Sequence, residues 1–323
     1  MAFQFKCLDV YAKQNLNLSE LAFYIMSCDY SAFTNDRCFN DKIPSGFLNR
    51  IFQNYYADVE DFLKINPSVH SEKGVHFNFR LQKKTQDILL SDEKAGKMSK
   101  YYFKGSSSKS GTPSVGKYLK AVFEEYARQP YFEREKIYFK EEYTKVKTAI
   151  ELKNIISFKY RDKEYKLAPY EVTLDEWSSY NYVVGFTGEN ELRDFRLSYM
   201  EDIEISYCKG NFTETQRKKA KKELIDKGVQ FLNSECKTIK VVFTAKGKKN
   251  YDHWVFLRPQ YITQEQLDDG YYRYTFKCTE QQAEYYFFKF GADAIIEEPI
   301  SLRKQFEDKY SKAILKYKEQ FFM

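Results

Sequence analysis

The chain has 323 residues, of which 43% are hydrophobic and 30% charged, and its formal net charge is +6. This length exceeds one typical hydrophobic core and predicts two or three domains, and the composition is that of a soluble globular protein. No run approaches the ~20 apolar residues of a spanning helix, and the N-terminus lacks the apolar centre of a signal peptide, so we expect a cytoplasmic protein without a membrane partner.

The first 139 residues contain an internal repeat. "GFLNRIFQNYYA" from Gly46 aligns with "GKYLKAVFEEYA" from Gly116, and a Pro-Ser pair lies just before each. Apolar residues at i, i+1, i+4, i+5 and i+8 give each copy one buried helical face, and Pro and Ser are helix-start signals. "LNLSELAFYIMS" and "KKTQDILLS" predict two more helices, and alternating runs at Phe3 to Lys6 and Phe77 to Arg80 predict short strands. The order strand, helix, helix therefore occurs twice.

This order resembles a tandem ribbon-helix-helix fold, in which two copies pair their strands into an antiparallel ribbon. A lone strand of four to six residues is not stable, and pairing within one chain removes the need for a partner. Polar residues that suit base edges or phosphates would line the outer face of the ribbon: Gln4, Lys6, Asn78 and Arg80. The alternative is that these side chains simply face water, as on any half-exposed ribbon.

The basic excess lies in the N-terminal part of the chain. Residues 1–140 hold 21 Lys and Arg against 16 Asp and Glu, and the segment from Glu93 to Lys120 has seven lysines and one acid around "YYF" and "GSSSKSG". Lysines near phosphates release condensed counterions, so this segment suits a polyanion-binding protein. The alternative is a solvated, partly disordered insertion.

Residues 140–212 predict a leading helix and four or five short strands, which is the pattern of a small β-barrel. The segments "TAIELKNIISFKY", "LAPYEV", "NYVVGF" and "RDFRLSYMEDI" follow one another in this region. Together they resemble the WYL domain, a bacterial Sm-like β-barrel named for a Trp-Tyr-Leu run. Asn181 and Val183 stand where the motif has Trp and Leu, and Tyr199 stands where a third arginine is expected.

The resemblance implies a nucleic-acid or nucleotide-like ligand at Tyr182, Arg193 and Arg196. A guanidinium plane can stack on a base and fork onto a phosphate, and a tyrosine offers a stacking face. The two arginines fall on opposite faces of an ideal strand, so one pocket would need a bulge to use both. The alternative is that Tyr182 belongs to the core and that both arginines pair with acids: Glu191, Asp194 or Glu201.

A basic helix over residues 213–235 is predicted as a linker. Strands and helices then alternate over residues 236–323, which predicts a small α/β sandwich. This part resembles the C-terminal extension of many WYL domains, with an Asp-Gly turn at Gly270, a helix ending at Gly291 and a last helix opening at Pro299. The resemblance implies a homodimer through this domain. The alternative is that the last helix, with Leu302 and Phe306, belongs to the intramolecular core.

The motifs predict no enzyme. The sequence lacks a Gly-rich phosphate loop, GxSxG and HExxH, and its six cysteines and three histidines form no CxxC pair or ligand cluster, so we expect no catalytic residue, metal or cofactor. A ribbon-helix-helix before a WYL domain resembles the accessory proteins of type VI-D CRISPR systems, which bind single-stranded RNA and stimulate the RNA-targeting effector. The alternative function is a ligand-responsive, DNA-binding transcriptional regulator of the WYL family.

Overall fold

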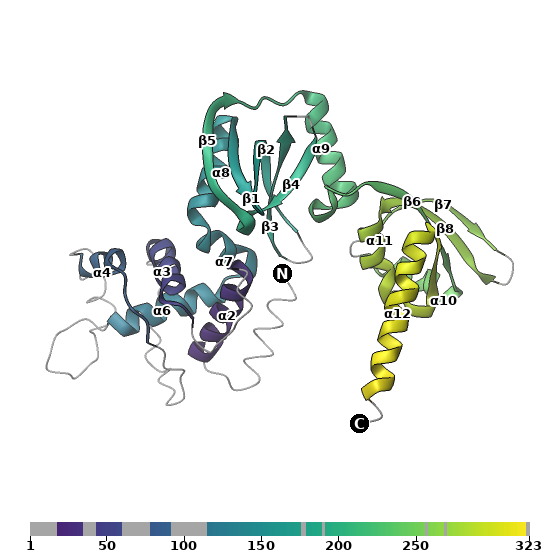
Figure 1. Ribbon diagram of the computed structural model, residues 1–323, viewed down its shortest axis with the longest axis horizontal. Helices are drawn as coiled ribbons and strands as arrows, with labels where there is room; N and C mark the ends of the chain where they lie inside the picture. The colour runs from purple at the N-terminus through teal and green to yellow at the C-terminus, as the bar shows by residue number, and fades with distance from the viewer. Residues whose placement is uncertain are drawn as a thin grey trace. The chain divides into compact units, whose positions relative to one another are not determined.

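The protein is a mixed α+β chain with two antiparallel sheets (Figure 1). The computed structural model describes residues 18–34, 43–59, 78–91, 115–175, 179–188, 191–255, 258–267 and 270–320. The chain divides into two compact units. The first contains Met1–Lys147, Glu176–Asn181 and Arg196–Ile203, and the second contains Thr148–Asp175, Tyr182–Phe195 and Glu204–Met323. No helix in the described ranges is long and apolar enough to cross a membrane.

Helices build the first unit. They are α2 (Leu18–Phe33), α3 (Ser45–Val59), α4 (Lys83–Leu90), α6 (Val115–Arg128), α7 (Tyr131–Tyr138) and the start of α8 (Lys140–Leu152). The repeat prediction is confirmed for its helices, because all five aligned apolar pairs of α3 and α6 are buried. The two repeated helices contact each other through Phe52 and Tyr118, whose ring centroids lie 6.1 Å apart, and through Tyr55 and Tyr126 at 6.3 Å.

A buried ion pair ties three of these helices together. The Asp29 carboxylate of α2 is fully buried and accepts hydrogen bonds from the Tyr126 hydroxyl of α6 at 2.7 Å and from Arg134 Nε and Nη2 of α7 at 2.7 and 2.9 Å. Three charge-assisted bonds to one carboxylate offset the cost of burying it. The network therefore fixes α7, whose other residues contribute to the site described below.

The predicted ribbon is not confirmed. Phe3 to Lys6, with Gln4 and Lys6, lies outside the described residues, and so do residues 92–114 of the basic segment. Of the second predicted strand, residues 78–80 are described, and they form no β-ladder. Arg80 is instead bonded to helix α3: its N–H donates to Ser45 Oγ at 2.9 Å, and its carbonyl accepts from Asn49 Nδ2 at 2.8 Å.

The first sheet has five strands in the order β4-β3-β2-β1-β5. They are β1 (Asn154–Tyr160), β2 (Lys163–Leu174), β3 (Asn181–Thr187), β4 (Leu192–Arg196) and β5 (Met200–Lys209). Gly185 permits close strand packing, because a Cβ there would lie 2.4 Å from the Ala168 carbonyl oxygen of β2. Among the described strands β4 and β5 are the two edges and are not paired with each other, so the predicted closed barrel is not confirmed.

Helix α9 (Glu214–Lys227), predicted as a linker, covers apolar side chains of the sheet. A capping box between Thr213 and Gln216 starts the helix. Ala220 is fully buried in a cluster with Val184 and Phe186 of β3. The helix therefore belongs to the hydrophobic core of the second unit.

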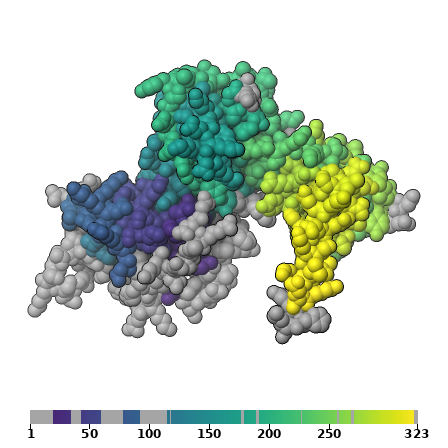
Figure 2. Space-filling model, in the orientation of Figure 1, coloured from purple at the N-terminus to yellow at the C-terminus, as the bar shows by residue number. Residues whose placement is uncertain are grey.

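The second sheet has the order β7-β8-β6-β9 and carries three helices. Its elements are β6 (Cys236–Phe243), α10 (Ala245–His253), β7 (Tyr261–Gln266), β8 (Tyr272–Thr279), α11 (Glu280–Phe287), β9 (Ala294–Glu298) and α12 (Ile300–Gln320). Leu302 and Phe306 of α12 are buried in this core, so the first half of the last helix is intramolecular core. Residues 311–319 are all exposed, and this end of α12 extends past the sheet in Figure 1 and is part of the yellow projection in Figure 2.

Candidate functional site

Arg196, one of the three predicted ligand residues, ends β4 inside a cage of aromatic side chains. Its guanidinium carbon lies 3.4 Å from the ring centroid of Tyr180 and 4.7 Å from that of Tyr199. Its Nη1 donates to the Tyr199 hydroxyl at 3.3 Å, and its Nη2 donates to the Tyr131 hydroxyl at 3.4 Å. Only 10% of the Arg196 side chain is exposed. We call Tyr131, Glu135, Tyr180, Arg196 and Tyr199 the Arg196 cage.

An internal carboxylate supplies the counter-charge of the Arg196 cage. Glu135 is fully buried, and its Oε1 lies 3.7 Å from Arg196 Nε; neither atom has a hydrogen bond to a residue that the structure describes. Glu135 and Tyr131 are four residues apart in α7 and share a helix face. Burial raises the pKa of Glu135, and hydrogen bonds from Asn181 act in the opposite direction. An anionic ligand of Arg196 would have to compete with this carboxylate.

Asn181 holds Glu135 in place. Its backbone N–H and its Nδ2 donate to Glu135 Oε2 at 2.7 and 2.8 Å, and Nδ2 also donates to the Phe132 carbonyl at 2.8 Å. Asn181 occupies the position where the WYL motif has tryptophan. The departure from the motif therefore has a structural consequence, because an indole ring could not reproduce both side-chain bonds.

The other two predicted ligand residues have different surroundings. Tyr182 is partly buried and packs beside Val184 and Phe186 of β3. Arg193 is 38% exposed and pairs with the Glu191 carboxylate at 2.8 Å. Tyr182 and Arg193 belong to the second unit and Arg196 to the first. The described contacts thus join none of the three to another, and their shared ligand site stays a prediction.

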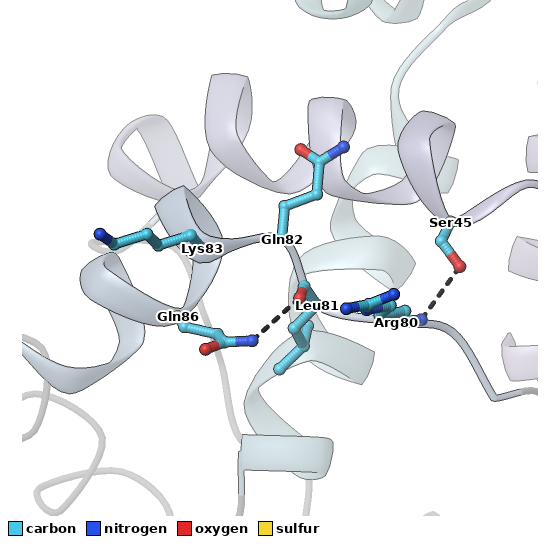
Figure 3. Close-up of a pocket in the computed structure, with 6 residues that line it drawn as sticks. All are labelled: Ser45, Arg80, Leu81, Gln82, Lys83 and Gln86. Carbon is cyan, nitrogen blue, oxygen red and sulfur yellow. Dashed lines mark hydrogen bonds between the residues drawn. The ribbon is translucent and has the colours of Figure 1, made fainter.

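A second candidate site has cations that form no ion pair with any residue that the structure describes. An open hollow of about 510 Å³ is lined by Ser45 at the start of α3, by residues leading into α4 and by the first turn of α4. Figure 3 shows Lys83 and Gln86 on one side of the hollow and Ser45, bonded to Arg80, on the other. We call this the Arg80 hollow, and its lining residues are Ser45, Arg80, Leu81, Gln82, Lys83 and Gln86.

Two basic side chains give the Arg80 hollow a positive charge. Arg80 and Lys83 are exposed, and neither forms an ion pair within the described part of the chain. Helix α4 begins at Lys83, so the positive end of its dipole adds to the two cations. Asn78 is exposed as well but does not line the hollow. Of the predicted ribbon residues, Arg80 alone is described as part of a concave surface.

The family comparison covers a different part of the chain from the Arg80 hollow. Residues 141–205 match the model of the WYL domain, and they span α8 and the strands up to the first half of β5. Residues 141–205 therefore carry the WYL domain that the motifs predicted. The match ends before the second sheet and begins after the helices that hold the Arg80 hollow.

The fold of the whole chain is similar to a crystal structure of a CRISPR Cas-related protein. The TM-score is 0.74 at 20% sequence identity, over 94% of this chain and 93% of that chain. Proteasome accessory factor B/C (PafBC) of Arthrobacter aurescens matches at a TM-score of 0.34 and 18% identity, over 66% of this chain and 33% of that chain. The comparison with curated proteins found no match.

The sequence patterns did not identify several residues of the Arg196 cage and of the Arg80 hollow. Lys83 had a local signal, since the pair Lys83-Lys84 lies three and four positions after Arg80. Glu135 had none, because it lies 61 positions before Arg196, whereas the acids considered as partners lay within a few residues of it. A long-range pair of this kind leaves no periodicity or spacing in a single sequence.

Proposed function

We propose that the protein is a non-enzymatic accessory protein that binds single-stranded RNA and stimulates an RNA-targeting type VI-D CRISPR effector. The observation that carries the proposal is the Arg80 hollow, whose two cations have no acidic partner in the described ranges. The WYL domain and a fold similar to that of a CRISPR Cas-related protein support the CRISPR setting.

The chemistry of the Arg80 hollow suits a nucleic-acid strand. Each cation that approaches a phosphate releases condensed counterions, which favours binding at low salt. The side-chain amides of Gln82 and Gln86 are partly used, since Gln82 Oε1 accepts from Gln53 Nε2 at 3.2 Å and Gln86 Nε2 donates to the Leu81 carbonyl at 2.9 Å. Their remaining amide atoms offer a donor and an acceptor to a base edge. A volume of about 510 Å³ lies in the range of sites that hold small ligands.

Single-stranded RNA suits a hollow better than a duplex does. An unpaired base can leave its stack and enter a concave site, whereas a duplex keeps its bases inside and offers mainly its backbone. The alternative, a ligand-responsive transcriptional regulator, would prefer duplex DNA. Polymer preference therefore separates the two functions.

Three finer structural features belong to the same proposal. The tandem ribbon-helix-helix would need the residues before α2 to pair with those before α4, and an Sm-like barrel would need contact between the edge strands β4 and β5. A homodimer through the C-terminal domain would use the exposed end of α12, where Ile314, Leu315 and Tyr317 are 54%, 57% and 69% exposed. Apolar residues gathered on one helix end are typical of an interface.

A polarisation titration at one fixed salt concentration tests the function. We expect unstructured RNA to bind more tightly than duplex DNA of equal length, and the double variant Arg80→Ala/Lys83→Ala to weaken RNA binding at least tenfold, or about 1.4 kcal/mol. The same variant should lower the stimulation of a type VI-D effector in a target-RNA cleavage assay.

The matched control removes two exposed lysines of β2, Lys163→Ala/Lys166→Ala. Its charge change is identical, so an equal loss of affinity in both double variants would mean diffuse attraction and no site at the Arg80 hollow. Tighter binding of duplex DNA than of RNA would support the transcriptional regulator instead.

A further inference from the structure

Asn49 lies fully buried in α3 beneath the Arg80 hollow. Its Nδ2 donates to the carbonyls of Ser45 at 2.6 Å and Arg80 at 2.8 Å. Its Oδ1 accepts from the Gln82 backbone N–H at 2.9 Å and from the Thr85 hydroxyl at 2.6 Å. Every donor and acceptor of this amide is used, which is the condition for burying it without loss of stability.

The hydrogen bonds from Asn49 to the Arg80 carbonyl and the Gln82 N–H have the pattern that a neighbouring β-strand would make. In an extended segment the carbonyl of one residue and the N–H two positions later point to the same side, where a partner strand would normally bind them. Here one side-chain amide binds both. This explains why the segment after Asn78 is ordered along α3 although it belongs to no sheet.

Neighbouring side chains strengthen the same attachment. Ser45 Oγ accepts from the Arg80 N–H at 2.9 Å, and Gln53 Nε2 donates to the Thr85 hydroxyl at 2.9 Å. The backbone of the segment is thus fixed from below, while the side chains of Arg80 and Lys83 stay exposed. Binding a ligand to a pre-ordered backbone costs less conformational entropy than binding it to a free loop.

We infer that Asn49 is a positioning residue, which fixes the protein segment that binds the phosphate backbone of a single strand. It lies under the site and does not reach the ligand, but it holds residues 80–82 so that Arg80 and Lys83 engage phosphates of the same strand together. The inference rests on the proposed function, because it requires the Arg80 hollow to bind a polyanion. It adds a residue from α3, which no motif assigned to binding.

The test compares two asparagines of one helix. Asn49→Asp removes both N–H donors and sets a carboxylate against two carbonyls. Asn54→Asp does the same at a site that links α3 to α7, since Asn54 Nδ2 donates to the carbonyls of Ile137 at 2.9 Å and Tyr138 at 3.1 Å. A third variant, Ser45→Ala, loosens the Arg80 segment without adding charge and keeps the buried amide intact.

The readout is the affinity for a short single-stranded RNA over a series of salt concentrations. For Asn49→Asp we expect at least a fivefold loss of affinity and a shallower dependence of log K on log salt, by about 0.7 for each phosphate that the variant no longer neutralises. Ser45→Ala should change both quantities in the same direction by less. Asn54→Asp should lower thermal stability and leave the salt dependence unchanged.

Two outcomes would overturn the inference. Equal affinity losses in Asn49→Asp and Asn54→Asp, with the salt dependence of the wild type, would mean that Asn49 acts on stability alone. Weakening by Arg80→Ala/Lys83→Ala without any effect of Asn49→Asp or Ser45→Ala would remove the positioning role and leave the proposed function in place. If Arg80→Ala/Lys83→Ala has no effect on RNA binding, the proposed site itself is wrong.

Discussion

Arg196 and Arg80 lie in the same unit and have opposite surroundings. Arg196 is enclosed by three tyrosines and faces the buried Glu135 carboxylate 3.7 Å away. Arg80 is exposed, its backbone is bonded to α3, and its side chain has no ion pair with any described residue. One guanidinium is consumed by intramolecular contacts, and the other is available to a ligand.

The two arginines therefore have different expected roles: the buried one stabilises the fold, and the exposed one can bind a ligand. A buried charge needs its partners, and removing one of a buried pair is strongly destabilising because the other charge is left uncompensated. An exposed, unpaired cation contributes little to the fold and can contact a phosphate without first breaking an internal bond. A motif arginine can therefore be assigned as a ligand residue only after its intramolecular partners have been identified.

The largest expected effect is on stability. Arg196→Ala leaves Glu135 buried without its counter-charge and removes the stacking on Tyr180, so the free energy of unfolding should fall by about 3 kcal/mol. Urea unfolding followed by circular dichroism measures this. Arg80→Ala is the matched control and should change the value by less than about 0.5 kcal/mol. A stable Arg196→Ala protein that no longer binds RNA would reverse the comparison and make the Arg196 cage the ligand site.

The free energy of unfolding should depend on pH through a buried carboxyl group that has no cationic partner among the described residues. Asp194 of β4 is 7% exposed, and burial raises its pKa from 3.8 to about 7. Between these two values the folded state holds a proton that the unfolded state has released, so stability decreases as the pH rises. From pH 5 to pH 8 the free energy of unfolding should fall by about 2.5 kcal/mol through this group.

Asp194→Asn removes this titration. Urea unfolding of wild type and variant at pH 5 and pH 8 isolates it, because other groups contribute equally to both proteins. We expect the variant to gain stability relative to the wild type at pH 8. A wild type and variant with the same pH dependence would show that the Asp194 carboxyl keeps its ordinary pKa, and that burial without a cation is tolerated there.

The smallest effect is expected at Arg193. It is 38% exposed, and its pair with Glu191 is a surface ion pair, so Arg193→Ala should change the free energy of unfolding by less than about 1 kcal/mol. RNA affinity in the titration above should change less than twofold. A tenfold loss of affinity at unchanged stability would instead return Arg193 to the ligand residues that the WYL resemblance implies.

Local sequence patterns predicted many of the helices and strands. The repeated i, i+1, i+4, i+5, i+8 spacing predicted α3 and α6 and their buried faces, and the strand segments of the WYL resemblance fall on β1 to β5. These predictions succeeded because periodicity depends on which face of an element meets the core. The ribbon was different: Asn78 to Arg80 alternates as a strand would, yet in the described residues its partner is a helix side chain.

The sequence by itself determined the helices, the order of the strands along the chain, the WYL domain and the basic character of the N-terminal part, because each depends on residue types at short spacing. Only the tertiary structure decided which arginine is paired internally and which has no ion pair among the described residues. Glu135 reaches Arg196, and Asn49 reaches Arg80 and Gln82, across separations of 61, 31 and 33 residues. Such partners are chosen by how the elements pack, and packing leaves no local trace in the chain.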